Sequence, residues 1–107
     1  MIVRVFTGRV AARREGDFNA RVRGRLDLIR DQPGNVYVTF ARKIEGGRER
    51  VMLITQWETA ADLYAWTGGD VGRPRSVDLE LLDEWRVDHW EALDPSPLDD
   101  PAGGSPD

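Results

Sequence analysis

The stretch over residues 51–57, which reads VMLITQW, constrains the fold of this chain more than any other. It is rich in β-forming residues and contains no glycine or proline, so it predicts a strand. A strand that is apolar on both faces has to be covered on both. Both alternating faces of this one are apolar, with Val51, Leu53 and Trp57 on one and Met52 and Ile54 on the other.

The residues after this strand predict a sharp turn into a short helix. Thr59 is a typical N-cap residue, and Asp62 follows three positions later in a weaker form of the capping box. Leu63 and Trp66 share one helical face. Gly68-Gly69 supplies the positive φ angles that end a helix. A central strand is therefore expected to run directly into a helix that folds back over its own sheet.

Periodicity predicts the remaining elements. Alternation of apolar residues predicts strands over residues 2–7, 36–42 and 84–93, and helical spacing predicts one amphipathic helix of about 15 residues through Phe18 and Ile29. Gly24 weakens this helix slightly, and Pro33-Gly34 ends it. A hairpin with glycine at its tip is expected over residues 44–48, and a short helical turn over residues 77–83.

The predicted order is β-α-β-β-α-β, an α+β, ferredoxin-like arrangement with a four-stranded antiparallel sheet. Its two helices can cover only one face of that sheet. Since the strands are apolar on both faces, a second copy of the chain is the economical cover for the other, which predicts a homodimer. Residues 1–93 form the domain, and residues 94–107 are a tail rich in Pro, Asp and Gly.

Composition excludes several classes of function. The chain has no cysteine, which excludes disulfides and thiolate chemistry, and its single histidine excludes a histidine-rich metal site within one chain. No stretch approaches the ~20 apolar residues of a membrane span, and the N-terminal apolar run is too short for a signal peptide. The cytoplasm is therefore the default location.

Charge is unevenly placed along the chain. Residues 1–50 carry 12 Lys and Arg against 6 Asp and Glu, whereas residues 76–107 carry one Arg against 10 acids. A basic nucleic-acid-binding face is one interpretation, but no aromatic residues are interleaved with the arginines of the first helix. Complementary packing and an acidic tail explain the asymmetry better, so no nucleic-acid partner is expected.

Three segments give the chain a family resemblance. They are LITQWET over residues 53–59, the helix around Leu63 and Trp66, and VDHWE over residues 87–91. Together with the order of elements, they resemble the antibiotic biosynthesis monooxygenase (ABM) family, whose members are dimeric α/β barrels. The resemblance covers residues 1–93 and is more specific for the fold than for the reaction. It implies a cofactor-independent monooxygenase, an oxidoreductase that acts on a flat aromatic, quinol or polyketide-like molecule without a metal or flavin.

The resemblance also suggests candidate site residues. His89 could take a proton from a phenolic substrate, and Arg4 could stabilise the resulting anion or bound superoxide. Trp66 could form an aromatic wall, while Tyr37 and Arg73, the latter in a loop that could act as a lid, are weaker substrate-binding candidates. We therefore expect the small aromatic ligand between the helices and the sheet.

Each candidate has a structural alternative. His89 could be a hydrogen-bonded strand residue, Trp66 could pack in the core, and Arg4 could form an ion pair with Asp88 or Glu91. On that interpretation the protein is a non-catalytic dimeric module that binds a small ligand or has a structural role. The haem-degrading branch of the family is a poorer match, because its first-strand Asn is missing here and its axial His corresponds approximately to Ser76.

Overall fold

The computed structural model of the protein describes residues 1–94. The expected order of elements is confirmed, although the first helix is divided in two. Apart from Asp94, the tail expected over residues 94–107 lies outside the described residues. The elements are β1 (Ile2–Val10), α1 (Glu15–Arg23), α2 (Leu26–Arg30), β2 (Asn35–Glu45), β3 (Arg48–Trp57), α3 (Ala60–Thr67), the 3-10 helix η1 (Leu79–Leu81) and β4 (Leu82–Glu91).

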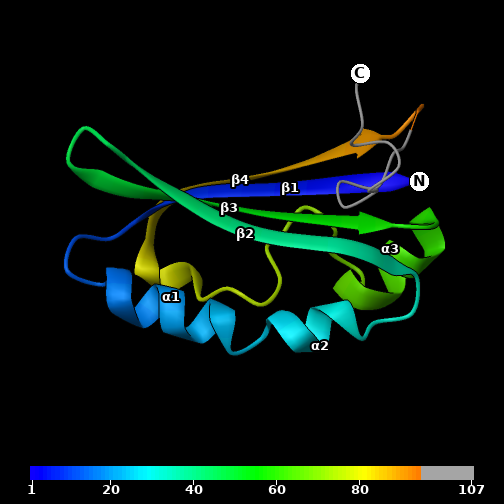
Figure 1. Ribbon diagram of the computed structural model, residues 1–107, viewed down its shortest axis with the longest axis horizontal. Coiled ribbons are helices and arrows are strands. Elements are labelled where there is room, and N and C mark those ends of the chain that lie inside the picture. Colours follow the sequence, from blue (N-terminus) through cyan, green and yellow to red (C-terminus); the bar gives the residue numbers. More distant parts are fainter. Residues whose placement is uncertain (95–107) are drawn as a thin grey trace, which may run out of the picture.

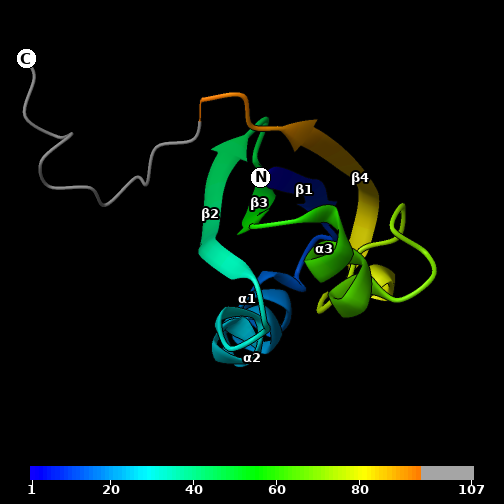
Figure 2. The same cartoon turned by 90° about the vertical axis from the view of Figure 1, so that its right-hand side faces the viewer.

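The four strands form one antiparallel sheet in the order β2-β3-β1-β4. All the helices lie on one side of this sheet, with α1 and α2 following each other along it (Figure 1). The view along the sheet shows α3 beside that pair, and within residues 1–94 no helix or strand covers the opposite face (Figure 2). We call these the helix face and the open face. The first and last strands are therefore neighbours, which the order of elements alone could not establish.

The strand β3 alternates as its sequence predicts. Val51, Leu53 and Trp57 are buried on the helix face, while Met52 and Ile54 are only partly buried on the open face. The buried side chains of β1 and β3 meet those of the helices in one apolar core between sheet and helices. Burial of this apolar area is the main driving force that holds the helices against the sheet.

The first helix differs from the expectation of one continuous helix. It is interrupted between α1 and α2 at Gly24 and Arg25, where the Arg25 amide bonds the Val22 carbonyl at 2.9 Å, one residue short of helical spacing. Glycine is a poor helix former, which explains why the break falls there. Both halves still bury apolar residues, Phe18 and Val22 in α1 and Ile29 in α2.

The corner between β3 and α3 agrees with its sequence signals. The Asp62 amide donates to the Thr59 hydroxyl oxygen at 3.1 Å, and that hydroxyl donates to the Asp62 carboxylate at 2.8 Å. The helix ends at Gly68, which has φ 77°. Gly69 has no positive φ, so the expectation of two left-handed glycines was wrong for the second. This corner fixes the direction in which α3 returns over the sheet.

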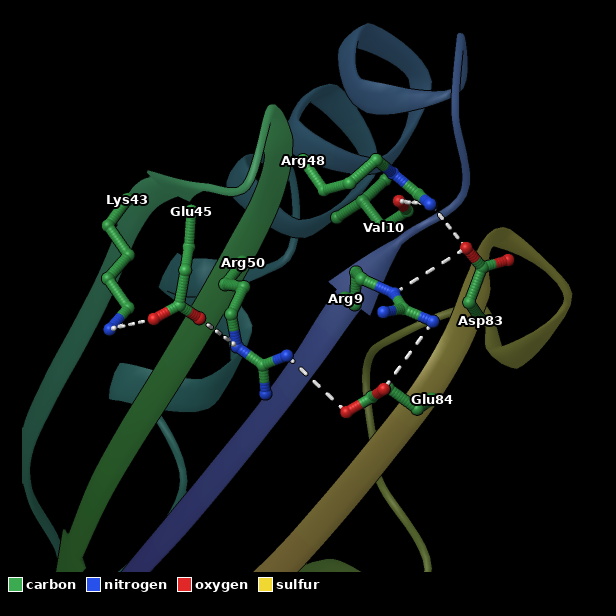
Figure 3. Close-up of polar contacts among 8 residues, drawn as sticks. All are labelled: Arg9, Val10, Lys43, Glu45, Arg48, Arg50, Asp83 and Glu84. Atoms are coloured by element: carbon green, nitrogen blue, oxygen red, sulfur yellow. Dashed lines mark hydrogen bonds and ion pairs between the residues drawn. The ribbon is translucent and has the colours of Figure 1, made fainter.

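A network of charged side chains joins the strands at the hairpin end of the sheet (Figure 3). Arg50 pairs with Glu84 at 3.3 Å and with Glu45 at 3.6 Å, and Arg9 pairs with Glu84 at 3.5 Å and Asp83 at 3.8 Å. These side chains are each about a third exposed or more, so each pair contributes little to stability. The network mainly places opposite charges next to one another at the ends of the strands.

None of the helices in the described part of the chain is long and apolar enough to cross a membrane.

Candidate functional site

Arg4 and His89 meet on the helix face of the sheet. They are directly opposite each other on the neighbouring strands β1 and β4, and the Arg4 NH1 group lies 2.9 Å from His89 Nε2. Arg4 is only 2% exposed, whereas His89 lies on an edge strand and is exposed. The two candidate catalytic residues therefore point to the same place, one covered and one accessible from the edge.

The contact between these two side chains defines the state of the imidazole. A guanidinium can only donate, so His89 Nε2 must accept, and the ring must be neutral with its proton on Nδ1. Burial lowers the pKa of His89 below its ordinary value of 6.5, and the charge of Arg4 lowers it further, against a smaller opposing effect of Asp88. A neutral imidazole near pH 7 has the protonation state of a general base.

Two tryptophans lie beneath Arg4. The guanidinium carbon of Arg4 is 5.5 Å from the centre of the Trp66 ring, which is within the range of a cation–π contact. Trp66 in turn stacks on Trp57, with ring centres 5.0 Å apart and an angle of 23° between the planes. Trp57 is fully buried and Trp66 is 7% exposed, so both are core residues in this state.

The segment over residues 70–76, which we call the 70–76 loop, covers Arg4. NH1 of Arg4 donates to the carbonyl oxygen of Val71 and NH2 donates to that of Arg73, each at 2.7 Å. Burial lowers the pKa of Arg4 to about 10, partly offset by the charge of Asp70. The space expected to hold a ligand is therefore filled by the protein's own loop.

The alternative interpretation of Arg4, an ion pair with Asp88 or Glu91, does not hold in the described residues. Within residues 1–94, no carboxylate lies within ion-pair distance of Arg4, and Asp88 instead pairs with Arg86 at 2.8 Å. Asp88 occupies the position next to His89, so its side chain lies on the open face. Arg4 is thus a buried cation with three neutral acceptors.

The other two candidates lie elsewhere. Tyr37 pairs with Gln56 on β3 and bonds the Thr39 hydroxyl on the open face, so the structure does not bring it to Arg4. Arg73 reaches Arg4 through its backbone carbonyl, while the residue itself is exposed. Of the five predicted residues, Arg4, His89 and Trp66 come together.

A cavity of about 340 Å³ lies on the opposite side of the sheet from Arg4. Its lining includes Thr7 and Met52 from the open face, together with Lys43 and Arg50 at its charged rim. Its position on the open face makes it part of the surface expected to meet a second copy. It is not the pocket expected between helices and sheet.

Thr55 is a buried residue of the site that the sequence did not reveal. It lies directly across from Arg4 on β3, is 1% exposed, and accepts a bond from Trp57 Nε1 at 2.9 Å. Its position on the same strand face as Trp57 was a usable signal. The carbonyl acceptors of the 70–76 loop had no such signal, since every residue carries a carbonyl.

Metal ligands do not gather in the part of the chain that the structure describes. No group of three or more His, Cys, Asp or Glu residues within residues 1–94 is arranged to hold a metal ion.

Comparison with known proteins adds the family. The family model described as antibiotic biosynthesis monooxygenase matches residues 1–71. The chain belongs to this family. The match includes Arg4 and Trp66, whereas His89 and most of the 70–76 loop follow it.

Solved structures of ABM-type proteins share the fold. A protein of this type from Deinococcus radiodurans superposes with a TM-score of 0.73 at 12% identity, covering 92% of this chain and 98% of that one. One from Nitrosomonas europaea superposes with a TM-score of 0.69 at 16% identity, covering 87% of this chain and 99% of that one. The haem degrader MhuD from Mycobacterium tuberculosis, with two haems bound in its active site, superposes with a TM-score of 0.65 at 18% identity. The match covers 91% of this chain and 100% of that one. No curated protein matched the chain. At these identities the likeness establishes the α+β, ferredoxin-like fold and no more.

Proposed function

We propose that this ABM-family protein is a cofactor-independent monooxygenase for a flat, electron-rich phenol or quinol. The observation that carries the proposal is the pairing of a neutral imidazole with a buried guanidinium at 2.9 Å, above a tryptophan. A base and a cation within reach of one oxygen atom are what deprotonation of a phenol requires.

The chemistry assigns a role to each group. When the substrate hydroxyl replaces the direct Arg4–His89 contact, its proton passes to His89 Nε2 and its oxygen becomes an anion facing Arg4. The electron-rich anion then reduces O2, and the resulting radical and superoxide combine at a ring carbon that bears hydrogen. The peroxide takes back the proton held by His89 Nε2, and the resulting hydroperoxide loses water, formed from its OH and the hydrogen of the same carbon. A carbonyl remains, so one oxygen atom enters the quinone product and the other leaves as water. Trp66 would bind the flat ring, and the exposed side chain of Arg73 would attract the anion.

The haem bound by the neighbour MhuD does not fit the residues present here. His89 is the only histidine of the chain, and its Nε2 is occupied by Arg4. A cationic guanidinium beside that nitrogen disfavours a second cation there. The proposal therefore uses no haem and derives no step through one.

A homodimer, with a cytoplasmic location, completes the proposal. It is supported by the open face, where Val5, Met52 and Ile54 lie side by side on β1 and β3 and are only partly buried. A second sheet would cover this apolar surface.

The test is oxygen consumption with 1,4-dihydroxynaphthalene, measured against protein-free autoxidation. His89→Gln keeps an acceptor for Arg4 but removes the base, so turnover should fall by roughly 10²- to 10⁴-fold with the unfolding midpoint preserved. The competing function, a non-catalytic ligand-binding module, is favoured by the closed loop over Arg4. Oxygen consumption by wild type no faster than protein-free autoxidation would favour that alternative, and equal rates above this background for wild type and His89→Gln would reject His89 as the base.

A further inference from the structure

The Arg4 guanidinium is an unusual buried cation. It is 2% exposed, and its three hydrogen-bond partners are the carbonyls of Val71 and Arg73 and the neutral ring of His89. Buried charges in proteins are normally paired with an opposite charge. Here the hydrogen-bond acceptors of the positive charge are neutral, and the charge of Asp70 acts on it only from beyond ion-pair distance, which leaves an electrostatic preference for an anion.

The two carbonyls hold Arg4 in a particular geometry. One accepts from NH1 and the other from NH2, each at 2.7 Å, so they occupy two donors of the guanidinium fork. This is the fork that binds the two oxygens of a carboxylate in bidentate pairs. The loop carbonyls therefore stand where the paired oxygens of an anionic ligand would bind.

The 70–76 loop is held mainly from outside. Besides Arg4, Arg25 on the helix side donates to the Ser76 carbonyl at 3.1 Å. Within the loop, the Arg73 amide reaches the Asp70 carbonyl only at 3.4 Å. Ser76 has φ 68°, a left-handed conformation that costs a non-glycine residue energy. A segment with these properties belongs to the easily opened part of a structure.

We propose that the 70–76 loop is a displaceable latch that occupies the anion site of Arg4, and that a flat aromatic ligand with paired oxygens, such as an aryl carboxylate, opens it. The inference rests on the proposed function in taking Arg4 and Trp66 as the ligand site, and it adds that the ligand carries a pair of anionic oxygens and that the loop controls its entry. The ligand's two oxygens replace the carbonyls of Val71 and Arg73, and its ring fills the space that the loop leaves.

The latch makes a quantitative statement about affinity. A ligand that binds only the open state has an apparent affinity reduced by the fraction of molecules that are open. Removing a contact that holds the loop closed, at a point remote from Arg4, should therefore raise the open fraction and tighten ligand binding. Arg25 provides that point, because it holds Ser76 without contacting Arg4.

Arg21 supplies a matched control for Arg25. Both arginines pair with Asp78, Arg21 at 2.9 Å and Arg25 at 3.4 Å, but only Arg25 also bonds the Ser76 carbonyl. Arg21→Gln thus removes an ion pair to Asp78 and leaves the loop tether in place. Arg4→Gln removes the anion site but also a buried core contact, so Arg25→Gln carries the test.

The experiment titrates 2-naphthoate and its neutral isostere 2-naphthamide into the full-length protein by calorimetry. Hydrogen exchange of the 70–76 loop is followed in parallel by mass spectrometry. Wild type should bind naphthoate at least about tenfold more tightly than naphthamide, since a bidentate charged pair is lost in the amide. Arg25→Gln should tighten naphthoate binding by roughly three- to tenfold and Arg21→Gln should leave it unchanged. Bound naphthoate should speed exchange in the loop.

Three results would overturn the latch: no binding of naphthoate, equal binding of the amide, or exchange in the loop that slows on binding. Equal affinities for Arg25→Gln and Arg21→Gln would overturn it as well. If the protein gives any of these results and still oxidises 1,4-dihydroxynaphthalene, the latch is rejected and the proposed oxygenase function is retained. If naphthoate opens the loop but the protein does not oxidise 1,4-dihydroxynaphthalene, the latch is retained and the proposed catalysis is rejected.

Discussion

Arg4 donates to His89 Nε2 from the position directly opposite on the neighbouring strand, at 2.9 Å. The bond exists only while the imidazole is neutral, because a protonated ring offers no acceptor and adds a second positive charge. The protonation of one exposed edge residue is thereby linked to the position of a buried cation. Through the carbonyls of Val71 and Arg73, it is also linked to the 70–76 loop.

This relationship predicts how stability depends on pH. The pKa of His89 in the folded protein is lowered by burial and by Arg4, whereas in the unfolded chain it lies near 6.5. Between the folded and the unfolded pKa, the unfolded chain therefore binds more protons than the folded protein. The stability contributed by neutral His89 is fully present above pH 6.5 and is lost as the pH falls through the lowered folded value. Urea denaturation at pH 7.5, 6.5 and 5.5 measures this loss.

His89→Gln is the control for the pH experiment. Glutamine can still accept from Arg4 but does not titrate, so the decline between pH 7.5 and 5.5 should be smaller than in wild type. Asp78, whose pKa is lowered mainly by its bond from Arg21, loses its contribution only below its ordinary value of 3.8. A decline of equal slope in both proteins would show that His89 is not the group responsible.

The buried hydroxyl of Thr55 should hold the tryptophan pair in place. Thr55→Val removes the acceptor of Trp57 Nε1 at nearly constant shape and leaves a buried donor without its partner, which should cost about 1–3 kcal/mol of unfolding free energy. The near-UV circular dichroism of the stacked Trp57 and Trp66 should also change. Thr55→Ser keeps the acceptor and should preserve the spectrum. An unaltered spectrum in Thr55→Val would mean that stacking alone orients the rings.

The sequence allowed the faces of the strands and the ends of α3 to be predicted, because both depend on local side chains. Arg4 and Phe6 are two residues apart in β1 and therefore share one face, and Thr59 is a residue type typical of N-caps. Strand adjacency, which brings His89 to Arg4, is a non-local property that alternation does not encode. The loop carbonyls were equally out of reach, since the backbone offers the same acceptor at every residue. The sequence predicts only a slight weakening of the helix at Gly24, whereas the structure has a break there. Helix propensity alone does not include the competing 3-10 hydrogen bond of the Arg25 amide.

The N-cap of α3 gives a separate prediction. Thr59→Ala removes the acceptor of the Asp62 amide at an exposed position, so it should lower the unfolding free energy by about 1 kcal/mol. Thr59→Ser retains the oxygen and should recover most of the loss. Chemical denaturation of the three proteins decides the matter, and equal midpoints for Ala and wild type would contradict the cap.

Two glycines should respond to alanine with opposite signs. A Cβ at Gly8 in β1 would lie 3.1 Å from the Glu84 carbonyl oxygen and 3.2 Å from the Phe6 ring, so Gly8→Ala should destabilise by about 1–3 kcal/mol. At Gly16 in α1 nothing lies within 4 Å, and alanine should stabilise the helix by up to about 1 kcal/mol. Thermal unfolding compares them directly. A stabilised Gly8→Ala variant would mean that β1 and β4 can separate locally.

The open face should be the surface of a homodimer. Ile54 lies at its centre, between Val5 on β1 and Thr39 on β2. Covering it with a second sheet would desolvate its side chain, so Ile54→Glu places a charge in an apolar interface and should separate the subunits. Ala61→Glu, at an exposed position of α3, adds the same charge away from that face and should leave the assembly unchanged. In sedimentation velocity at micromolar concentration, wild type and Ala61→Glu should have twice the chain mass of 12.1 kDa, and Ile54→Glu should have the single mass. A wild-type protein that sediments as a monomer would leave the apolar open face exposed and refute the dimer.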